Sequence, residues 1–267
     1  MKKYRFLIAR RFTQLSIIAL YILANIYGIN ILMGNLSNSL VLQTVNLSDP
    51  FAVLQMIFAG AIISFDIALG ALIISIFYFI LGGRAFCSWV CPVNIITDCA
   101  NYLRRVLKFD EVQKKQPATR NLRYWLILIS FIISYFIGVA AFELISPVSM
   151  VHRGLIFGLG FGLATMIVIF LFDLFVLKNG WCGHICPLGG FYSLIGRFSL
   201  LRVHHNSEKC TACMKCKVVC PEIQVLHMID KSSEPVLQEC TLCARCIEVC
   251  EDDALNFELR NYMKEKK

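Results

Sequence analysis

The chain is short of charge. Only 16% of its 267 residues are Asp, Glu, Lys or Arg, whereas 57% are hydrophobic. A soluble domain of this length needs more polar residues to cover its surface, so the composition excludes a wholly soluble protein. The hydrophobic residues are gathered in runs of about twenty, the length at which a helix spans roughly 30 Å of hydrocarbon.

Lys and Arg are missing altogether from residues 12–83, although five basic residues precede this stretch. Eight more follow it, from Arg84 to Arg123. Basic residues grouped in alternate segments are the positive-inside pattern of a protein that crosses a membrane several times. The net charge of +8 therefore indicates topology, and nucleic-acid binding is disfavoured because no basic face alternates with exposed aromatic residues. The N-terminal apolar run also lacks a small-residue cleavage site, so it is predicted to be a retained span rather than a signal peptide.

Four apolar runs are predicted to form a membrane all-α four-helix transmembrane bundle within residues 1–200. An even number of spans places both termini in the cytoplasm, and Arg153 is then the only one of the 26 basic residues on the outer side. Residues 34–48, rich in Asn and Ser, fit an outer loop after the first span, and Asp49 and Pro50 fit the start of a helix. The predicted spans are residues 12–33, 61–81, 124–144 and 155–177.

Cysteine, by contrast, is abundant: the chain has 13, and eight of them form two runs within residues 201–267. Both runs have the spacing C-x2-C-x2-C-x3-C, the bacterial ferredoxin pattern, and they repeat at an offset of 30 residues. Three thiolates on a tight loop hold three corners of a cubane, and the fourth cysteine of each run closes the other cluster. We therefore predict two [4Fe–4S] clusters, one bound by Cys210, Cys213, Cys216 and Cys250, and the other by Cys240, Cys243, Cys246 and Cys220.

Disulfides and zinc sites are two other uses of cysteines in close-spaced runs. Disulfides are disfavoured because the charge pattern places both runs in the reducing cytoplasm. Zinc sites remain an alternative, although zinc usually takes two C-x2-C pairs separated by a longer spacer. With short strands expected at residues 224–229 and 254–259, residues 201–267 are predicted to be a cytoplasmic α+β domain of the bacterial 2[4Fe–4S] ferredoxin type. His204 and His205 lie in a polar linker before the first run and are expected to be solvated.

Two further cysteine pairs share a C-x3-C-P motif in the membrane part. Cys87 and Cys91 precede Pro92, and Cys182 and Cys186 stand in the same arrangement 95 residues later, each pair just after an even-numbered span. The repeat indicates a duplicated two-helix unit, whose four thiolates could hold a third iron–sulfur centre at the cytoplasmic boundary. A redox-active dithiol pair and a purely structural role remain alternatives.

Two other candidate metal ligands in the membrane part are assigned smaller roles. Cys99 has no counterpart in the second half and is expected to be an ordinary buried thiol. His184 lies inside the second motif and is expected to contact the site without binding metal, because Trp89, which cannot bind a metal, occupies the matching position in the first motif.

Carboxylates inside apolar spans are energetically unfavourable and therefore mark candidate functional sites. Asp66 and Glu143 lie near the outer ends of their spans, and Asp173 lies near the inner end of the fourth. His152 and Arg153 occupy the outer turn. Quinol oxidation needs a proton acceptor within hydrogen-bond reach of each hydroxyl, so Asp66, Glu143 and His152 form a predicted catalytic quinol and proton site. The alternative is that these residues are hydrated or paired at the membrane interface.

The order of four spans, two C-x3-C-P motifs and a terminal two-cluster run resembles the NapH/MauN family of ferredoxin-type membrane proteins, and its NapH branch most closely. The resemblance covers residues 10–260. It implies a multi-pass protein of the bacterial inner membrane that takes electrons from menaquinol or ubiquinol as a quinol dehydrogenase subunit. It also implies a periplasmic ferredoxin-type partner with several [4Fe–4S] clusters, NapG, and a nitrate reductase as final acceptor. An electron-donating assembly or maturation factor for a periplasmic metalloenzyme is the alternative.

Overall fold

The structure, a computed structural model of the chain, describes residues 4–28, 31–109, 121–158 and 160–260. The chain forms two compact units, each of which combines segments that are distant in the sequence. The helical unit consists of Gln14–Ile76 and Cys91–Phe191, and the cysteine-rich unit consists of Met1–Thr13, Phe77–Val90 and Tyr192–Lys267.

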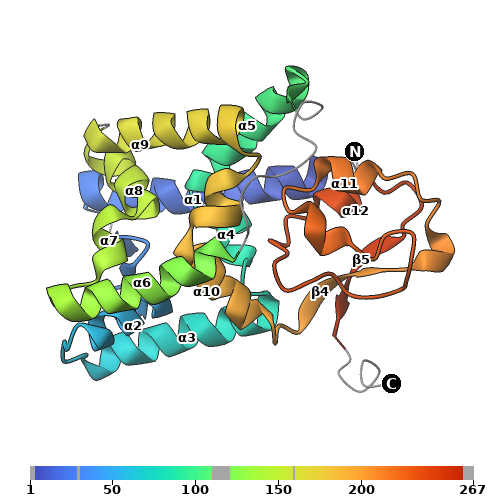
Figure 1. Cartoon of the computed structure of the whole chain (residues 1–267). Coiled ribbons are helices and arrows are strands. Elements are labelled where there is room, and N and C mark those ends of the chain that lie inside the picture. Colours follow the sequence, from blue (N-terminus) through green and yellow to red (C-terminus); the bar gives the residue numbers. More distant parts are fainter. Residues whose placement is uncertain (1–3, 29–30, 110–120, 159, 261–267) are drawn as a thin grey trace. The chain divides into compact units, whose positions relative to one another are not determined.

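Helices make up most of the helical unit (Figure 1). Three of them, α1, α3 and α10, run from one unit into the other. The helices are α1 (Arg5–Tyr27), α2 (Pro50–Phe58), α3 (Phe65–Leu81), α5 (Val93–Val106), α6 (Leu122–Ile137), α7 (Ala141–Ile145), α8 (Pro147–Phe157), α9 (Gly160–Leu171) and α10 (Pro187–Gly196), with the π-helical turns η3 (Phe172–Val176) and η4 (Trp181–Ile185) between α9 and α10.

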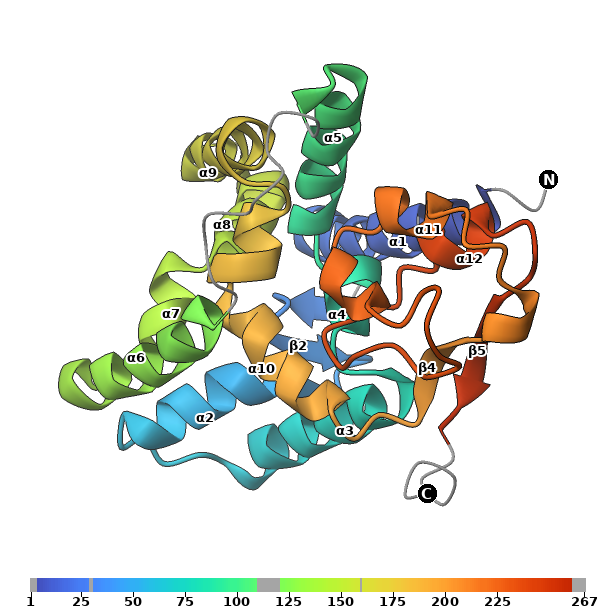
Figure 2. The same ribbon diagram turned by 45° about the vertical axis from the view of Figure 1, so that its right-hand side comes forward.

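The segment predicted as an outer loop folds into most of a three-stranded antiparallel sheet, and its side of the membrane stays a prediction (Figure 2). Leu42 and Gln43 join its second and third strands with φ angles of 50° and 58°, and the Thr44 N–H donates to the Val41 carbonyl oxygen. Positive φ at both central residues is the conformation of a type I′ hairpin turn, which Asn-Gly usually signals and Leu-Gln does not. The strands are β1 (Leu32–Gly34), β2 (Asn38–Val41) and β3 (Val45–Ser48).

Helix α1 begins and ends earlier than the predicted first span, residues 12–33. It begins at Arg5 because the basic residues of its first turns are good helix formers. One of these, Arg10, is fully buried, so the start of α1 packs against the protein instead of projecting into water. The helix ends at Tyr27 because Gly28 has a φ of 67°, the left-handed conformation that terminates helices.

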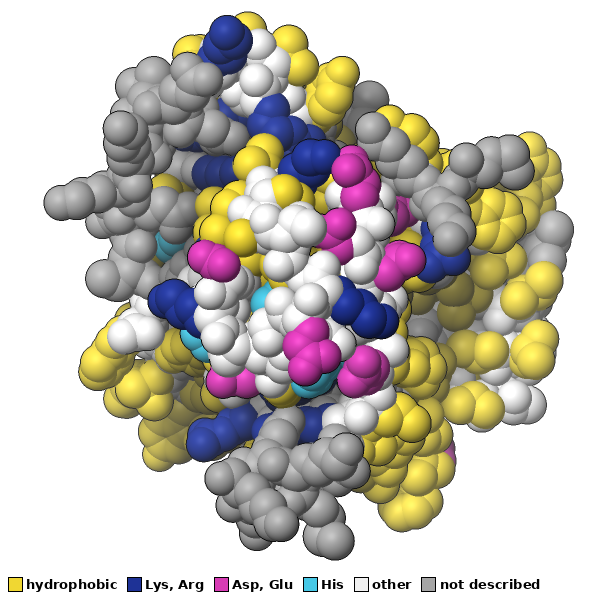
Figure 3. Space-filling model, turned by 90° about the vertical axis from the view of Figure 1, so that its right-hand side faces the viewer, with side chains coloured by type: hydrophobic (Ala, Val, Ile, Leu, Met, Phe, Trp, Pro, Cys, Tyr) yellow, Lys and Arg dark blue, Asp and Glu magenta, His cyan; other side chains and the backbone are white. Residues whose placement is uncertain are grey.

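Apolar segments recur at the positions of the four predicted spans. Of the helices in the described part of the chain, α1 alone is long and apolar enough to cross a membrane, whereas Phe65–Leu81, Leu122–Ile137 and Gly162–Val176 are apolar but shorter. Hydrophobic side chains also gather along the margins of the face shown in Figure 3. Exposed apolar surface of this extent is unusual in a protein surrounded by water. On α3 the exposed side chains include Leu69, Leu72, Ile73 and Ile76.

Helix α2 buries its N-terminal half in the helical unit, where polar contacts hold it. The Asp49 side chain caps it by accepting a hydrogen bond from the Ala52 N–H (3.2 Å), and Pro50 follows at the first helical position, so the predicted helix start is confirmed. The fully buried Gln55 accepts a hydrogen bond from the Phe142 N–H at its Oε1 (2.9 Å), which joins α2 to α7.

In its described residues the cysteine-rich unit contains a two-stranded antiparallel sheet, three short α-helices and two 3-10 helices (Figure 2). The strand predicted at residues 254–259 is confirmed, but the strand predicted at 224–229 is wrong, because that segment forms a 3-10 turn. Val225 and Leu226 are both buried although they are adjacent, whereas a half-buried strand alternates. The elements are α4 (Ala85–Trp89), β4 (Leu201–His205), η5 (Ser207–Lys209), α11 (Lys215–Val219), η6 (Ile223–Leu226), α12 (Arg245–Val249) and β5 (Leu255–Leu259).

The expected polar linker is strand β4, which pairs with β5 so that His205 lies opposite Leu255. His205 is fully buried, and its Nδ1 lies 2.7 Å from the Ser232 carbonyl oxygen. His204 is half-buried. The expectation of two solvated histidines is therefore wrong for His205, because strand pairing turns it inward.

Candidate iron–sulfur sites

The two ferredoxin runs fold in the same way, as their repeat predicts. Ala212 and Met214 have φ angles of 54° and 58° in the first run, and Leu242 and Ala244 have 53° and 59° in the second. Positive φ is uncommon outside glycine, and it turns successive backbone N–H groups toward one side of a loop. The Leu242 N–H, for example, donates to the sulfur of Cys240 (3.4 Å). Loops of this form suit an anionic, sulfur-ligated group.

Each loop leads into a short helix, and these helices, α11 and α12, pack against each other (Figure 2). Each helix carries the third cysteine of its run, and the fourth follows at its end. This geometry sends the fourth cysteine of each run into the cavity of the other run. The first cavity is lined by Cys210, Cys213, Cys216 and Cys250, and the second cavity by Cys220, Cys240, Cys243 and Cys246.

The structure thus brings together both sets of cysteines that the spacing predicts. Among the residues that the structure describes, no group of three or more His, Cys, Asp or Glu side chains is close enough to hold a single metal ion. Four thiolates around zinc converge on one point, whereas a cubane keeps them at separate corners.

The thiols of the second cavity are hard to ionise on their own. Burial, followed by the charges of neighbouring cysteines, raises the pKa of Cys220 and of Cys246 well above the ordinary thiol value. Both thiols are therefore neutral at pH 7 until a metal displaces their protons. A bound cluster would supply the positive iron that keeps these sulfurs ionised.

Helix α4 contacts the second cavity within the cysteine-rich unit. The Ser88 hydroxyl donates to the Thr241 carbonyl oxygen (2.6 Å), and the Trp89 indole N–H donates to the Leu242 carbonyl oxygen (3.1 Å). Both carbonyl groups belong to the cysteine loop of the second cavity, and α4 itself carries Cys87. The first C-x3-C-P motif is therefore fastened to that loop, a contact that the sequence pattern does not reveal.

The second C-x3-C-P motif lies in the helical unit, on the π-helical turn η4. Cys182 is half-buried and Cys186 is buried. The Gly189 N–H, in the first turn of α10, donates to the Cys186 sulfur (3.5 Å). Asp173 is fully buried and accepts a hydrogen bond from the Trp181 N–H (3.0 Å), so this candidate carboxylate fixes the start of η4.

Two buried arginines hold the backbone around the second motif. Arg123 Nη1 donates to the Gly183 carbonyl oxygen (3.5 Å). Arg104 Nη1 donates to the carbonyl oxygens of Asp173 (3.1 Å) and Leu174 (2.8 Å). Guanidinium groups thus satisfy carbonyls that the π-helical turns leave outside a regular helix ladder.

The third centre remains a prediction. Cys87 belongs to the cysteine-rich unit. Cys91 and both cysteines of the second motif belong to the helical unit. Within the helical unit Cys91 is buried, and its carbonyl oxygen accepts a hydrogen bond from Gln14 Nε2 (3.2 Å). Each half of the first motif is thus anchored by hydrogen bonds within its own unit, as the second motif is within the helical unit.

The expectation that Cys99 is buried is wrong, because it is exposed on α5. The buried face of this amphipathic helix includes Ala100 and Arg104, and Cys99 points away from it. His184 is buried on η4, and its expected contact with the site remains a prediction.

A second group of polar side chains lies at the junction of α7 and α8. Glu143 accepts hydrogen bonds from the hydroxyls of Ser37 (2.6 Å) and Ser149. His152 follows Ser149 by three residues on α8, so both lie on the same helix face. It packs edge-on against Tyr21, with ring centroids 4.6 Å apart. His152 is only 1% exposed, and neither of its ring nitrogens has a hydrogen-bond partner among the described residues.

The predicted quinol site is therefore only partly assembled. Burial, followed by the charge of the exposed Arg153, lowers the pKa of His152 to about 4, so this imidazole is neutral at pH 7. Asp66 is exposed in the first turn of α3 and takes no part in the contacts around Glu143.

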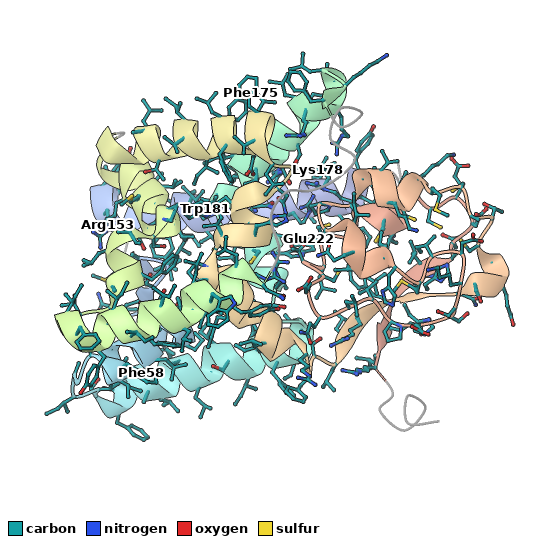
Figure 4. All side chains as sticks on the ribbon, viewed as in Figure 1. Phe58, Arg153, Phe175, Lys178, Trp181 and Glu222 are labelled. Atoms are coloured by element: carbon teal, nitrogen blue, oxygen red, sulfur yellow. The ribbon has the colours of Figure 1, made fainter. Side chains whose placement is uncertain are left out.

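Figure 4 shows Arg153 on α8 and Lys178 just after η3 at opposite ends of the helical unit.

Comparison with known protein families assigns iron–sulfur binding to both parts of the chain. Residues 53–110 and 159–204, which contain the two C-x3-C-P motifs, match the family described as "4Fe-4S binding domain". Residues 202–251 match the family described as "4Fe-4S dicluster domain".

Three curated proteins are similar over most of this chain. "Ferredoxin-type protein NapH" of Haemophilus influenzae is 41% identical, over 96% of this chain and 90% of its own length. NapH of Escherichia coli is 38% identical, over 97% and 91%. "Methylamine utilization ferredoxin-type protein MauN" of Paracoccus denitrificans is 41% identical, over 84% and 78%. No solved structure matches the chain.

Proposed function

Because the chain belongs to the NapH/MauN family of ferredoxin-type iron–sulfur electron-transfer proteins, we propose that it oxidises quinol in the bacterial inner membrane and passes the electrons through its clusters. The observation that carries the proposal is a pair of four-cysteine cavities in a chain whose helices expose apolar surface and enclose a buried polar group. Iron–sulfur clusters held in the cysteine cavities would carry electrons. The polar side chains would accept the protons that the substrate releases.

The membrane part is a four-span bundle formed by α1, α3, α6 and α9 with η3. Helix α3 has 17 residues, about 25 Å at about 1.5 Å per residue, which spans most of a hydrocarbon core of about 30 Å. The absence of Lys and Arg between residues 12 and 83 supports an outer location for the sheet β1–β3. Both termini then lie in the cytoplasm.

Two [4Fe–4S] clusters occupy the first and second cavities, each held by the four cysteines that line it. A [4Fe–4S] cluster supplies a one-electron carrier when it is bound. The third centre is held by Cys87, Cys91, Cys182 and Cys186. The match of residues 53–110 and 159–204 to a 4Fe-4S binding family supports it, because both motifs lie within the matched residues.

The group around Glu143 and His152 is the proposed quinol and proton site. Oxidation of a quinol releases two electrons and two protons, so two acceptors are needed near its hydroxyls. The carboxylate of Glu143 offers an acceptor to one hydroxyl, and the neutral ring of His152 can accept a hydrogen bond from the other. Ser149 holds the carboxylate beside α8. The exposed Asp66 is left out of this site.

Replacing Glu143 with Gln, or His152 with Phe, is expected to slow cluster reduction by a menaquinol analogue at least about tenfold, the lower end of the effect of losing a positioned proton acceptor. Anaerobic stopped-flow spectroscopy of the purified protein measures the rate. Dithionite should still reduce the clusters fully in both variants. Asp66→Asn is the matched control and should react as the wild type does. A slow Asp66→Asn variant beside a normal Glu143→Gln variant would contradict the assignment.

The electron acceptor is proposed to be a periplasmic ferredoxin-type protein with several [4Fe–4S] clusters, of the NapG kind, that feeds a nitrate reductase. The ferredoxin-type protein NapH and the methylamine utilization ferredoxin-type protein MauN are equally similar to this chain, at 41% identity. Because the relatives serve differently named systems, one alternative is kept, an electron-donating maturation factor for another periplasmic metalloenzyme. An assay of quinol oxidation in the absence of any immature enzyme distinguishes the two functions. A quinol dehydrogenase subunit oxidises quinol under these conditions, whereas a maturation factor does not.

A further inference from the structure

An ion pair is buried beside the second cavity. Arg84 Nη1 lies 2.9 Å from Glu222 Oε1, and the two side chains are 0% and 1% exposed. The same Nη1 donates to the carbonyl oxygen of Glu239 (2.8 Å). Arg84 comes from the segment before α4, whereas both partners belong to the ferredoxin part, so the contact joins distant segments of the cysteine-rich unit (Figure 4 labels Glu222).

This ion pair lies next to cysteines of the cavity. Glu222 lines the cavity and follows Cys220 by two residues, and Glu239 directly precedes Cys240. Both charges therefore lie within two residues of cysteines that line the cavity, Glu222 by its place in the chain and Arg84 through its contacts with Glu222 and the Glu239 carbonyl oxygen.

The first cavity is built differently despite the repeat. Asp252 stands at the position of Glu222 and lines the first cavity, but its carboxylate accepts hydrogen bonds from the N–H and hydroxyl of Thr211. The ion pair near this cavity, Lys215 with Glu251 (2.7 Å), has side chains that are 50% and 78% exposed. Water and salt screen such a pair, so it has little influence at a distance.

Reduction adds one negative charge to a [4Fe–4S] cluster, and a buried charge nearby changes the free energy of that step with little screening. A buried cation stabilises the reduced state and a buried anion stabilises the oxidised state. Stability alone does not explain the pair, since well-packed hydrophobic residues often stabilise a protein as well or better. We propose that Arg84 and Glu222 set the reduction potential of the cluster in the second cavity, with Arg84 raising it and Glu222 lowering it.

The inference rests on the proposed ligand sets and goes beyond them. The two clusters would then have different reduction potentials, although the sequence repeat alone predicts similar ones. It also places the tuned cluster next to α4 and Cys87, where electrons would pass between the ferredoxin part and the first C-x3-C-P motif. Arg84 and Glu222 act on the cluster through their charges and do not bind its iron.

A mediated redox titration followed by EPR, with no quinol present, tests the inference. At the potential where the wild-type second cluster is half reduced, Arg84→Gln is expected to lower the ratio of reduced to oxidised cluster about tenfold, a shift of about 59 mV for one electron. Glu222→Gln is expected to raise the ratio. The first cluster should keep its potential in both variants. Cys243→Ala, which leaves the first cavity intact, identifies the two signals.

Two further variants keep the test decisive. Lys215→Gln removes the cation of the exposed pair and should shift neither cluster by more than about twofold. The double variant Arg84→Gln with Glu222→Gln keeps a neutral hydrogen-bonded pair and should titrate near the wild type. If the Arg84→Gln variant does not keep its iron, the reduction potential of the second cluster in Glu222→Gln alone decides the test. Shifts of the same sign in both single variants, or an unchanged potential in Glu222→Gln, would overturn the inference, and neither result depends on quinol oxidation.

Discussion

Replacing Cys243 with Ala is expected to remove about four irons from the anaerobically purified protein, the content of one cubane. Cys243 is buried and lines the second cavity with three other cysteines, so Ala leaves one corner of the cluster without a ligand. The first cavity keeps all four of its cysteines. Iron and acid-labile sulfide analysis measures the loss, and EPR of the dithionite-reduced protein should show one remaining cluster.

Cys99→Ser is the control for this loss. Cys99 is exposed on α5 and lies outside every cysteine motif, so its replacement should leave iron content and spectra unchanged. Cys216→Ala should remove the other signal, because Cys216 lines the first cavity. Wild-type iron content in Cys243→Ala would contradict the assignment of the second cavity.

Joint replacement of Cys87 and Cys182 with Ala should remove the proposed third centre. The protein is expected to lose about four irons while both tail clusters keep their EPR signals. It should also lose reduction of the tail clusters by quinol, because the centre beside α4 is the proposed link between the quinol site and the second cavity. Dithionite should still reduce the tail clusters, since it needs no such link.

This result also distinguishes the alternatives for the C-x3-C-P motifs. A redox-active dithiol pair would leave the iron content at the wild-type level but impair quinol oxidation. A structural role would lower the yield of folded protein without a selective effect on either readout. Unchanged iron together with unchanged quinol reduction would contradict the third centre.

The cluster sites could be predicted from the sequence because covalent spacing fixes them. Three cysteines within seven residues must share one loop, and the repeat requires the two loops to fold alike. The structure gives both loops positive φ at equivalent positions, Met214 and Ala244. The two cavities collect the predicted cysteines from both runs.

The sheets could not be predicted because their signals are not local. Leu42 and Gln43 form a hairpin turn without the residues that usually mark one, so the sequence does not reveal the adjacent strands. Strand β4 is identified only by its pairing with β5, more than 50 residues later, and that pairing buries His205. The apolar residues near Val225 imitate a strand but are buried in consecutive positions.

The charge pattern predicts the side of the membrane but not the role of each residue. Arg84, Arg104 and Arg123 all belong to the predicted cytoplasmic segment, and all three are buried. Their hydrogen bonds go to carbonyl oxygens or a carboxylate from distant segments, which only the folded chain brings near. A basic loop in the sequence is thus partly an internal scaffold around the two C-x3-C-P motifs.

The central claim is that quinol electrons reach the iron–sulfur clusters of this chain. Anaerobic mixing of the wild-type protein in liposomes with a reduced menaquinol analogue, followed by freeze-quench EPR, tests it most directly. Reduced-cluster signals should appear with quinol alone, and quinol oxidation should continue when a multi-cluster ferredoxin-type acceptor is added. Clusters that stay oxidised under quinol, with and without that acceptor, yet are reduced by dithionite, would contradict the claim.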